Sequence, residues 1–150
     1  MIHPSQSSYY VMHFLLIFIF SFFSFHSANA ITKDPKTYLI IEEIQKNEQC
    51  NLEQALRLAL QRVVGAYVVV LVSEDEPGTL FAARKGSPLV IGVGKGEHFL
   101  ASDATPIIEY TKEVVYVNDY ELAIVKPDEL ILKNLGNEKV TPFITKLDMD

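Results

Sequence analysis

The stretch AYVVVLVSEDEPGTLFAA, residues 66–83, decides which fold the sequence predicts. Residues 66–72 are apolar without a break, which is typical of a strand that is covered on both faces. The polar residues 74–78 follow, with Pro-Gly at their end, and residues 80–83 are apolar again. A polar turn between two apolar runs indicates an antiparallel hairpin. We therefore expect this hairpin to lie inside a layered domain.

Two amphipathic helices are predicted before the hairpin. The first begins after the Asp-Pro pair at residues 34–35, an N-cap followed by proline, and should end near residue 47. The second opens at Asn51, with Gln54 placed to return a capping hydrogen bond, and should end at Gly65. The apolar faces are formed by Ile40, Ile41 and Ile44 in the first helix and by Leu52, Ala55, Leu56, Ala59, Leu60 and Val63 in the second.

Short strands dominate the chain after the hairpin. A short helix is also expected over residues 104–110, capped by Asp103 or Ser102, and the pattern fades into a polar tail after Asn134. Two helices followed by mostly antiparallel strands belong to the α+β class. The strands are expected over residues 89–93, 98–101, 113–117, 121–125 and 129–132, the last three as a meander.

The first thirty residues differ from the rest because they contain no Lys, Arg, Asp or Glu. Residues 11–25 are apolar, and Ala-Asn-Ala at residues 28–30 has the spacing that a signal peptidase accepts. Three interpretations stay open. The segment is an export signal, a membrane anchor that is short against the ~20 residues of a span, or an accidental extension translated from non-coding DNA.

Composition excludes several classes of function. The net charge is −6 without a basic cluster, so the sequence predicts no nucleic-acid partner, and a membrane partner only if residues 1–30 are retained. Cys50 is the single cysteine, which excludes an internal disulfide and a multi-thiolate zinc site. His98 has no second imidazole within residues 31–150 and is expected to begin a strand. We predict no metal and no cofactor. The glycine-rich residues 92–96 indicate a turn, since a phosphate loop needs a Lys-Ser/Thr pair and a helix after it.

Three separated motifs resemble one enzyme family in the same order along the chain. They are RVVGAY at residues 62–67, ARKGSPLVIGVGKGEHFLASD at residues 83–103 and TPIIEYT at residues 105–111. The chain resembles glutamine:fructose-6-phosphate aminotransferase (isomerizing), also called glucosamine-6-phosphate synthase, from about Lys36 to its end. The resemblance covers only the later half of the N-terminal glutaminase domain of that enzyme.

Composition, for residues 1–30, and the resemblance, for the rest, together imply a division of the chain. Residues 1–30 form the apolar N-terminal segment, and residues 31–140 form a partial type-2 glutamine amidotransferase domain. Residues 141–150 form the start of the link to a sugar-phosphate isomerase domain. The implied fold is a partial αββα sandwich of the N-terminal-nucleophile hydrolases.

The family also implies a mechanism. A terminal cysteine attacks the side-chain amide of glutamine, its own α-amino group acts as the base, and ammonia travels to a second domain that holds fructose-6-phosphate. The logic is sound because a thiol is only a few per cent ionised at pH 7, and a free terminal amine titrating near 8 accepts its proton.

The sequence lacks the terminal cysteine that this mechanism requires. Position 2 is Ile2, and cleavage after Ala30 would expose Ile31, which has no nucleophilic side chain. Cys50 is no substitute because its amine is part of a peptide bond. The family's arginine segment for the glutamine carboxylate and its His-Asn-Gly oxyanion segment are missing. Since lost oxyanion donors alone cost about 10²- to 10³-fold in rate, we predict a truncated domain with no catalytic residue and no activity alone.

Asp103 is the one candidate binding residue. The resemblance implies that it holds the α-amino group of bound glutamine, as a carboxylate suits an ammonium. The alternative is that it only caps the short helix after it. Arg84 and Lys85 have two interpretations as well, a solvated strand end or a buried ion pair of Arg84.

An incomplete sandwich has consequences for partners and location. Strands over residues 66–72 and 89–93 should lose neighbours, which predicts self-association or a missing half-domain as partner. The alternative function is a non-catalytic binding or assembly module, exported or complementing a separately encoded half-domain. Localisation stays open, because family members are cytosolic and the N-terminal segment suggests export.

Overall fold

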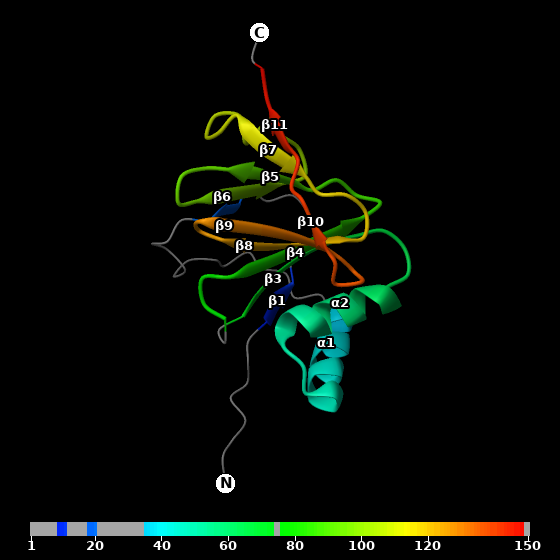
Figure 1. Ribbon diagram of the computed structural model, residues 1–150. Helices are drawn as coiled ribbons and strands as arrows, with labels where there is room; N and C mark the ends of the chain where they lie inside the picture. The colour runs from blue at the N-terminus through cyan, green and yellow to red at the C-terminus, as the bar shows by residue number, and fades with distance from the viewer. Residues whose placement is uncertain (1–8, 12–17, 21–34, 74–75, 149–150) are drawn as a thin grey trace.

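The computed structural model describes residues 9–11, 18–20, 35–73 and 76–148, which form two helices and two antiparallel sheets. The first sheet has the strand order β1-β3-β4-β8-β9-β10, and the second β11-β7-β5-β6-β2. The strands are β1 (Tyr9–Val11), β2 (Phe18–Phe20), β3 (Tyr67–Ser73), β4 (Leu80–Lys85), β5 (Val90–Val93), β6 (His98–Ala101), β7 (Glu113–Tyr116), β8 (Glu121–Lys126), β9 (Glu129–Asn134), β10 (Lys139–Val140) and β11 (Ile144–Lys146). The sheets stack, with the helices beyond the first sheet (Figure 1).

The helices α1 (Pro35–Glu48) and α2 (Leu52–Arg62) form where the apolar periodicity predicts them. The side chain of Asn51 caps α2 by accepting a hydrogen bond from the backbone N–H of Gln54 at 2.8 Å. The helix ends at Arg62, earlier than the predicted boundary, because Val63 is already extended. Gly65, with φ +95°, then turns the chain toward β3.

The hairpin of β3 and β4 is confirmed, and apolar layers cover both of its faces. Val69 and Leu71 pack against the helices, whereas Val70 and Val72 pack against the second sheet. The helix-side core contains Ile41, Ile44, Leu52, Ala55, Leu56, Ala59, Leu60, Tyr67, Val69, Leu71, Phe81, Ala83, Leu122, Ile124 and Leu135. The continuous apolar run therefore reflects a central sheet between two other layers.

The outer face of the second sheet is covered by residues 102–111, where a short helix was predicted. The segment is a series of turns instead. Ala104 O accepts hydrogen bonds from the N–H groups of Ile107 and Ile108, and Ile107 O accepts from those of Tyr110 and Thr111. These bonds mix i−3 and i−4 partners, so no continuous α-helical ladder develops.

The predicted meander is wrong, because its strands belong to different sheets. Strand β7 pairs with β5 in the second sheet, whereas β8 and β9 extend the first sheet beside β4. The chain crosses between the sheets at residues 117–120. There Val117 N donates to Leu89 O at 3.1 Å, and Tyr120 has a φ of +63°. The predicted polar tail also differs, since it contributes the strands β10 and β11.

The sheet edges differ in part from the expectation of lost neighbours, because residues 67–70 of β3 lack a partner on one side among the described residues whereas β5 does not lie at an edge. Strand β5 lies between β6 and β7, and residues 90–92 are paired on both sides. Strand β1 pairs with residues 71–73 of β3, and β2 pairs with residues 98–100 of β6. Both β1 and β2 come from the apolar N-terminal segment, so parts of that segment add an edge strand to each sheet.

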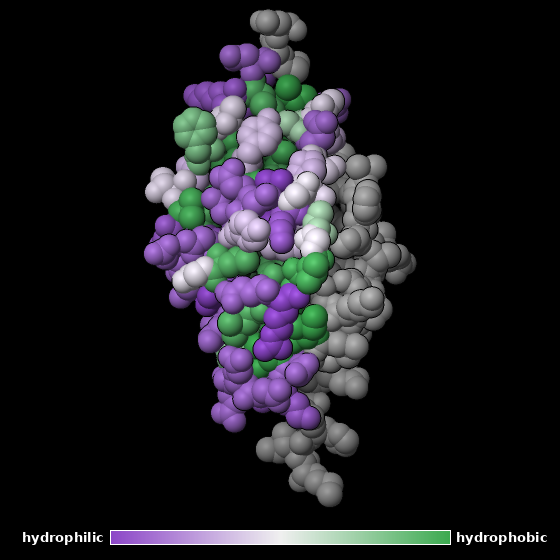
Figure 2. Space-filling view, turned by 90° about the vertical axis from the view of Figure 1, so that its right-hand side faces the viewer, coloured by the Kyte–Doolittle hydropathy of each residue, from purple (hydrophilic) through white to green (hydrophobic). Residues whose placement is uncertain are grey.

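The other features predicted for the N-terminal segment, including the cleavage motif at residues 28–30 and the Asp34 cap, lie outside the described residues. No helix among the described residues is long and apolar enough to cross a membrane. On the face shown in Figure 2, polar side chains cover much of the surface, with smaller apolar areas between them.

Candidate functional site

Asp103 is the second residue after β6, near the start of the turn segment formed by residues 102–111, and its side chain is exposed. Its Oδ1 accepts a hydrogen bond from the backbone N–H of Thr105 at 2.7 Å and another from Thr105 Oγ1 at 2.8 Å. Asp103 therefore caps a turn, rather than the helix that the sequence predicts. The second oxygen, Oδ2, makes no hydrogen bond to any described residue, so it is available to a ligand.

Both hydrogen bonds from Thr105, the backbone bond more strongly, lower the pKa of the Asp103 carboxyl. The side chain is therefore a carboxylate at neutral pH and remains one into mildly acidic conditions. Because the pKa of Asp103 is lower in the folded chain than in the unfolded chain, ionised Asp103 stabilises the folded state. This stabilisation is fully present above the unfolded pKa. It is lost as the pH falls through the folded pKa.

Replacing Thr105 by valine is expected to raise the titration midpoint of Asp103 toward the ordinary aspartate value. The substitution removes the hydroxyl donor and leaves the backbone donor in place. A ¹³C NMR titration of the side-chain carboxyl measures the midpoint, and Thr141→Val, an exposed position in another loop, is the control. An unchanged midpoint in Thr105→Val would show that the hydroxyl does not stabilise the carboxylate.

Close packing holds the segment that carries Asp103 against β5 and β6. Ile107 is fully buried, and Thr111 Oγ1 donates a hydrogen bond to Val93 O at 2.7 Å. The rings of Phe99 and Tyr110 stack with their centroids 5.0 Å apart. Gly92 leaves the space that this packing needs, because a Cβ there would lie 2.5 Å from Ile107 Cγ2. Asp103 is thus an exposed carboxylate on a well-anchored support.

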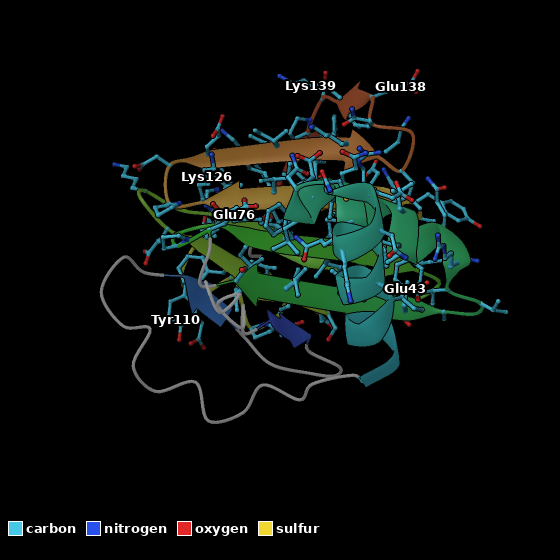
Figure 3. The ribbon with its side chains drawn as sticks, turned by 90° about the horizontal axis from the view of Figure 1, so that it is seen from below. Glu43, Glu76, Tyr110, Lys126, Glu138 and Lys139 are labelled. Carbon is cyan, nitrogen blue, oxygen red and sulfur yellow. The ribbon has the colours of Figure 1, made fainter. Side chains whose placement is uncertain are left out.

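Cys50 lies far from this segment in the layered structure. It is partly buried between α1 and α2, and it packs against the helix-side core on the outer face of the first sheet. The segment with Asp103 covers the outer face of the second sheet. In Figure 3, which looks onto the helices and the sheets behind them, Glu43 of α1 and Tyr110 are also well apart across the view. Since packed sheets are about 10 Å apart, the structure does not bring the thiol and Asp103 together.

Arg84 forms an ion pair near the end of β4, but the pair is partly buried rather than buried, since the Asp119 side chain is 47% exposed. Its Nη2 lies 3.1 Å from Asp119 Oδ1, and the Arg84 side chain is only 19% exposed. Lys85 extends toward the surface, with its Nζ 5.3 Å from the centre of the Tyr120 ring. The arginine therefore belongs to the packing between β4 and the crossing at residues 117–120.

The remaining candidate features have structural roles. Residues 94–97 form the turn between β5 and β6, with Gly94 N donating to Glu97 O at 3.0 Å. His98 begins β6 as predicted, but its side chain is buried, which the sequence does not indicate. No group of three or more His, Cys, Asp or Glu side chains able to hold a metal ion occurs among the described residues.

Two solved structures share this architecture. The chain matches glutamine phosphoribosylpyrophosphate amidotransferase from B. subtilis with a TM-score of 0.57 and 17% identity, over 73% of this chain and 24% of that one. It matches the allosteric regulatory enzyme of purine biosynthesis with a TM-score of 0.55 and 18% identity, over 66% of this chain and 21% of that one. The predicted α+β fold is confirmed, and it is that of the N-terminal-nucleophile amidotransferases.

Sequence relatives narrow this class. The chain is 48% identical over 110 residues to glutamine–fructose-6-phosphate aminotransferase [isomerizing] of Chlorobaculum tepidum, and 43% identical over 111 residues to that of Bacteroides thetaiotaomicron. Each match covers 73% of this chain and 18% of the relative. No family model matches the chain. The chain is a homologue of the glutamine–fructose-6-phosphate aminotransferases, and it spans less than a fifth of their length.

Proposed function

We propose that this chain supplies the ammonium-binding part of a glutaminase site, in which Asp103 holds the α-ammonium group of glutamine. We further propose that these 150 residues do not hydrolyse glutamine by themselves. Homology to the glutamine–fructose-6-phosphate aminotransferases supports glutamine as the ligand. The position of an ionised, exposed carboxylate on an anchored turn is the observation that carries the proposal.

Several properties of Asp103 suit an ammonium group. Thr105 orients the carboxylate through Oδ1, so ligand binding need not order a freely rotating side chain. The Oδ2 atom can then accept a charge-assisted hydrogen bond from the ligand. The lowered pKa keeps the negative charge in place at neutral pH.

The chemistry of hydrolysis needs groups that the described part of the chain does not assemble beside Asp103. An amidotransferase of this class requires a thiol activated by a neighbouring amine. Cys50 packs on the other side of both sheets. Catalysis is therefore expected only when another segment brings a nucleophile and oxyanion donors to this site.

The purified chain is expected to release no ammonia from glutamine above the buffer rate, in an assay coupled to glutamate dehydrogenase. In ¹⁵N NMR titrations, glutamine should shift the Asp103 and Thr105 amide signals. Glutaramic acid, which lacks the α-amino group, should not shift them. Asp103→Asn retains an oxygen acceptor for Thr105 and removes the charge, so it should weaken glutamine binding about fivefold, the upper end for an exposed ion pair.

The matched control is Glu109→Gln, which removes another exposed carboxylate from the same turn segment. It should bind glutamine like the unmodified chain. Equal shifts with glutamine and glutaramic acid, or equal weakening by both substitutions, would contradict the role of Asp103. Ammonia release would contradict only the proposed inactivity.

The edge of β3 favours a second candidate function, that of an assembly module. Strand β1 pairs only with residues 71–73, so residues 67–70 have no strand partner on that side among the described residues. Such an edge can accept a strand from a separately encoded half-domain or from a second copy. Light scattering after size-exclusion chromatography should show a dimer or a larger species, and a monomer at all concentrations would disfavour self-association.

A further inference from the structure

His98 connects the two sheets at the end of the sandwich away from Asp103. It is the first residue of β6 in the second sheet, and its ring hydrogen bonds to the backbone of Lys126, the last residue of β8 in the first sheet. Asp103 follows the other end of β6. This contact between the sheets is therefore separate from the glutamine site proposed above.

The surroundings of the His98 ring favour its neutral form. The residue is only 3% exposed, and its Nδ1 is buried without a hydrogen-bond partner among the described residues. The bond to Lys126 favours the protonated ring, as a donated bond does, so Nε2 donates it to the backbone carbonyl. Protonation at Nδ1 adds a second N–H group and a positive charge where no described residue supplies an acceptor. A buried unpaired donor and a buried charge both cost free energy.

Nearby charges do not offset this cost. Burial lowers the pKa of His98 below its ordinary value, and the bond to Lys126 and the charge of the exposed Asp128 raise it by less. The Lys126 side chain itself pairs with Glu129, with 3.7 Å between Nζ and Oε2. The charged residues in the turns and strands around the ring are Lys95, Glu97, Glu113, Lys126, Asp128, Glu129 and Lys146.

A cavity of about 260 Å³ beside the ring offers the charged form an alternative position. The turn between β5 and β6 lines it with Gly94 and Gly96, and the turn between β8 and β9 lines it with Pro127 and Asp128. His98 is also a lining residue, although its Nδ1 is buried. A ring rotated toward the cavity would carry its charge to water and toward the carboxylate of Asp128, and its bond to β8 would break.

We propose that His98 is an acid-sensitive switch at the contact between the two sheets. The neutral ring holds the turn between β5 and β6 against the end of β8, and the protonated ring rotates into the cavity and releases that turn. Because the pKa of His98 is lower in the folded chain than in the unfolded chain, the stabilisation by the neutral ring is fully present above the unfolded value of about 6.5. It is lost as the pH falls through the folded pKa.

NMR spectroscopy of the full 150-residue chain over a pH series tests this proposal. The ring signals of His98 should titrate with a midpoint below about 6.5. The Gly94 amide donates to Glu97 O at 3.0 Å, and its protection from hydrogen exchange should fall at least about threefold through that midpoint. The Val117 amide, which donates to Leu89 O at the other end of β5, should keep its protection within about twofold. A midpoint at or above the ordinary value, or constant Gly94 protection, would overturn the proposal.

Variants separate the switch from a general effect of acid. His98→Gln keeps an Nε2 donor for the Lys126 carbonyl and does not titrate, so its Gly94 protection should not depend on pH. Asp128→Asn removes the carboxylate that favours the charged ring and should lower the His98 midpoint, whereas Glu129→Gln removes a charge near the same turn and should leave the midpoint unchanged. An equal fall of Gly94 protection in His98→Gln would overturn the proposal. If that variant does not fold, the other two decide, and equal His98 midpoints in them would overturn the proposal.

Discussion

Replacing Arg84 by methionine is expected to lower the free energy of unfolding by about 2–4 kcal/mol, because the guanidinium joins three separate partners. Its Nε donates to Ser87 O and its Nη1 to Val117 O at 3.1 Å, while Nη2 pairs with Asp119. Asp119 also accepts a hydrogen bond from Gly86 N at 2.8 Å. The arginine thus ties the end of β4 to the crossing between the sheets.

Urea denaturation followed by circular dichroism measures this loss. Lys85→Met is the matched control, because it removes a neighbouring positive charge whose one polar contact among the described residues is with the Tyr120 ring. Its effect should stay below about 1 kcal/mol. Similar losses in the two variants would mean that net charge, rather than the hydrogen bonds of Arg84, explains the result.

Gly92→Ala is expected to destabilise the chain by about 2 kcal/mol and to displace the segment that carries Asp103. A Cβ at this position would lie 2.5 Å from Ile107 Cγ2 and 2.9 Å from Thr111 Cγ2. Both atoms belong to the segment that packs on the outer face of the second sheet. The added methyl group therefore forces this segment outward, and the Asp103 and Thr105 amide signals should shift.

The control for this substitution is Gly136→Ala, where the nearest atom to a new Cβ is Asn134 Oδ1 at 3.2 Å, a much looser contact than the one at Gly92. Its destabilisation should stay below about 1 kcal/mol. Ile107→Leu removes the Cγ2 atom, so combining it with Gly92→Ala should cost less than the sum of the two single changes. Additive losses would show that the predicted contact is not the cause.

Local sequence patterns predict the elements that depend on near neighbours. The unbroken apolar run at residues 66–72 indicates a strand covered on both faces, and the structure places it between the helices and the second sheet. Asn51 predicts the start of α2 because a cap acts over three residues. The turn at residues 94–97 follows from its glycines in the same way.

Part of the candidate site can likewise be predicted from the sequence, and part of it is seen only in the structure. Resemblance to a family identifies Asp103 before its surroundings are known, but the capping bond from Thr105 and the support from Gly92 emerge only in the structure. The buried Nδ1 of His98 is not predicted at all. A single histidine beside Glu97 gives no local signal of burial, because the facing turn is about thirty residues away in the chain.

The sequence by itself determined the two helices, the central hairpin, most of the strands and the α+β class, because periodicity and capping act between residues close in the chain. Only the tertiary structure decided that β7 and β8 join different sheets, that β1 and β2 occupy sheet edges, and that Arg84 joins β4 to the crossing. The reason is physical. A strand carries the same alternation whichever sheet it joins, and its partners are selected by long-range hydrogen bonding and packing.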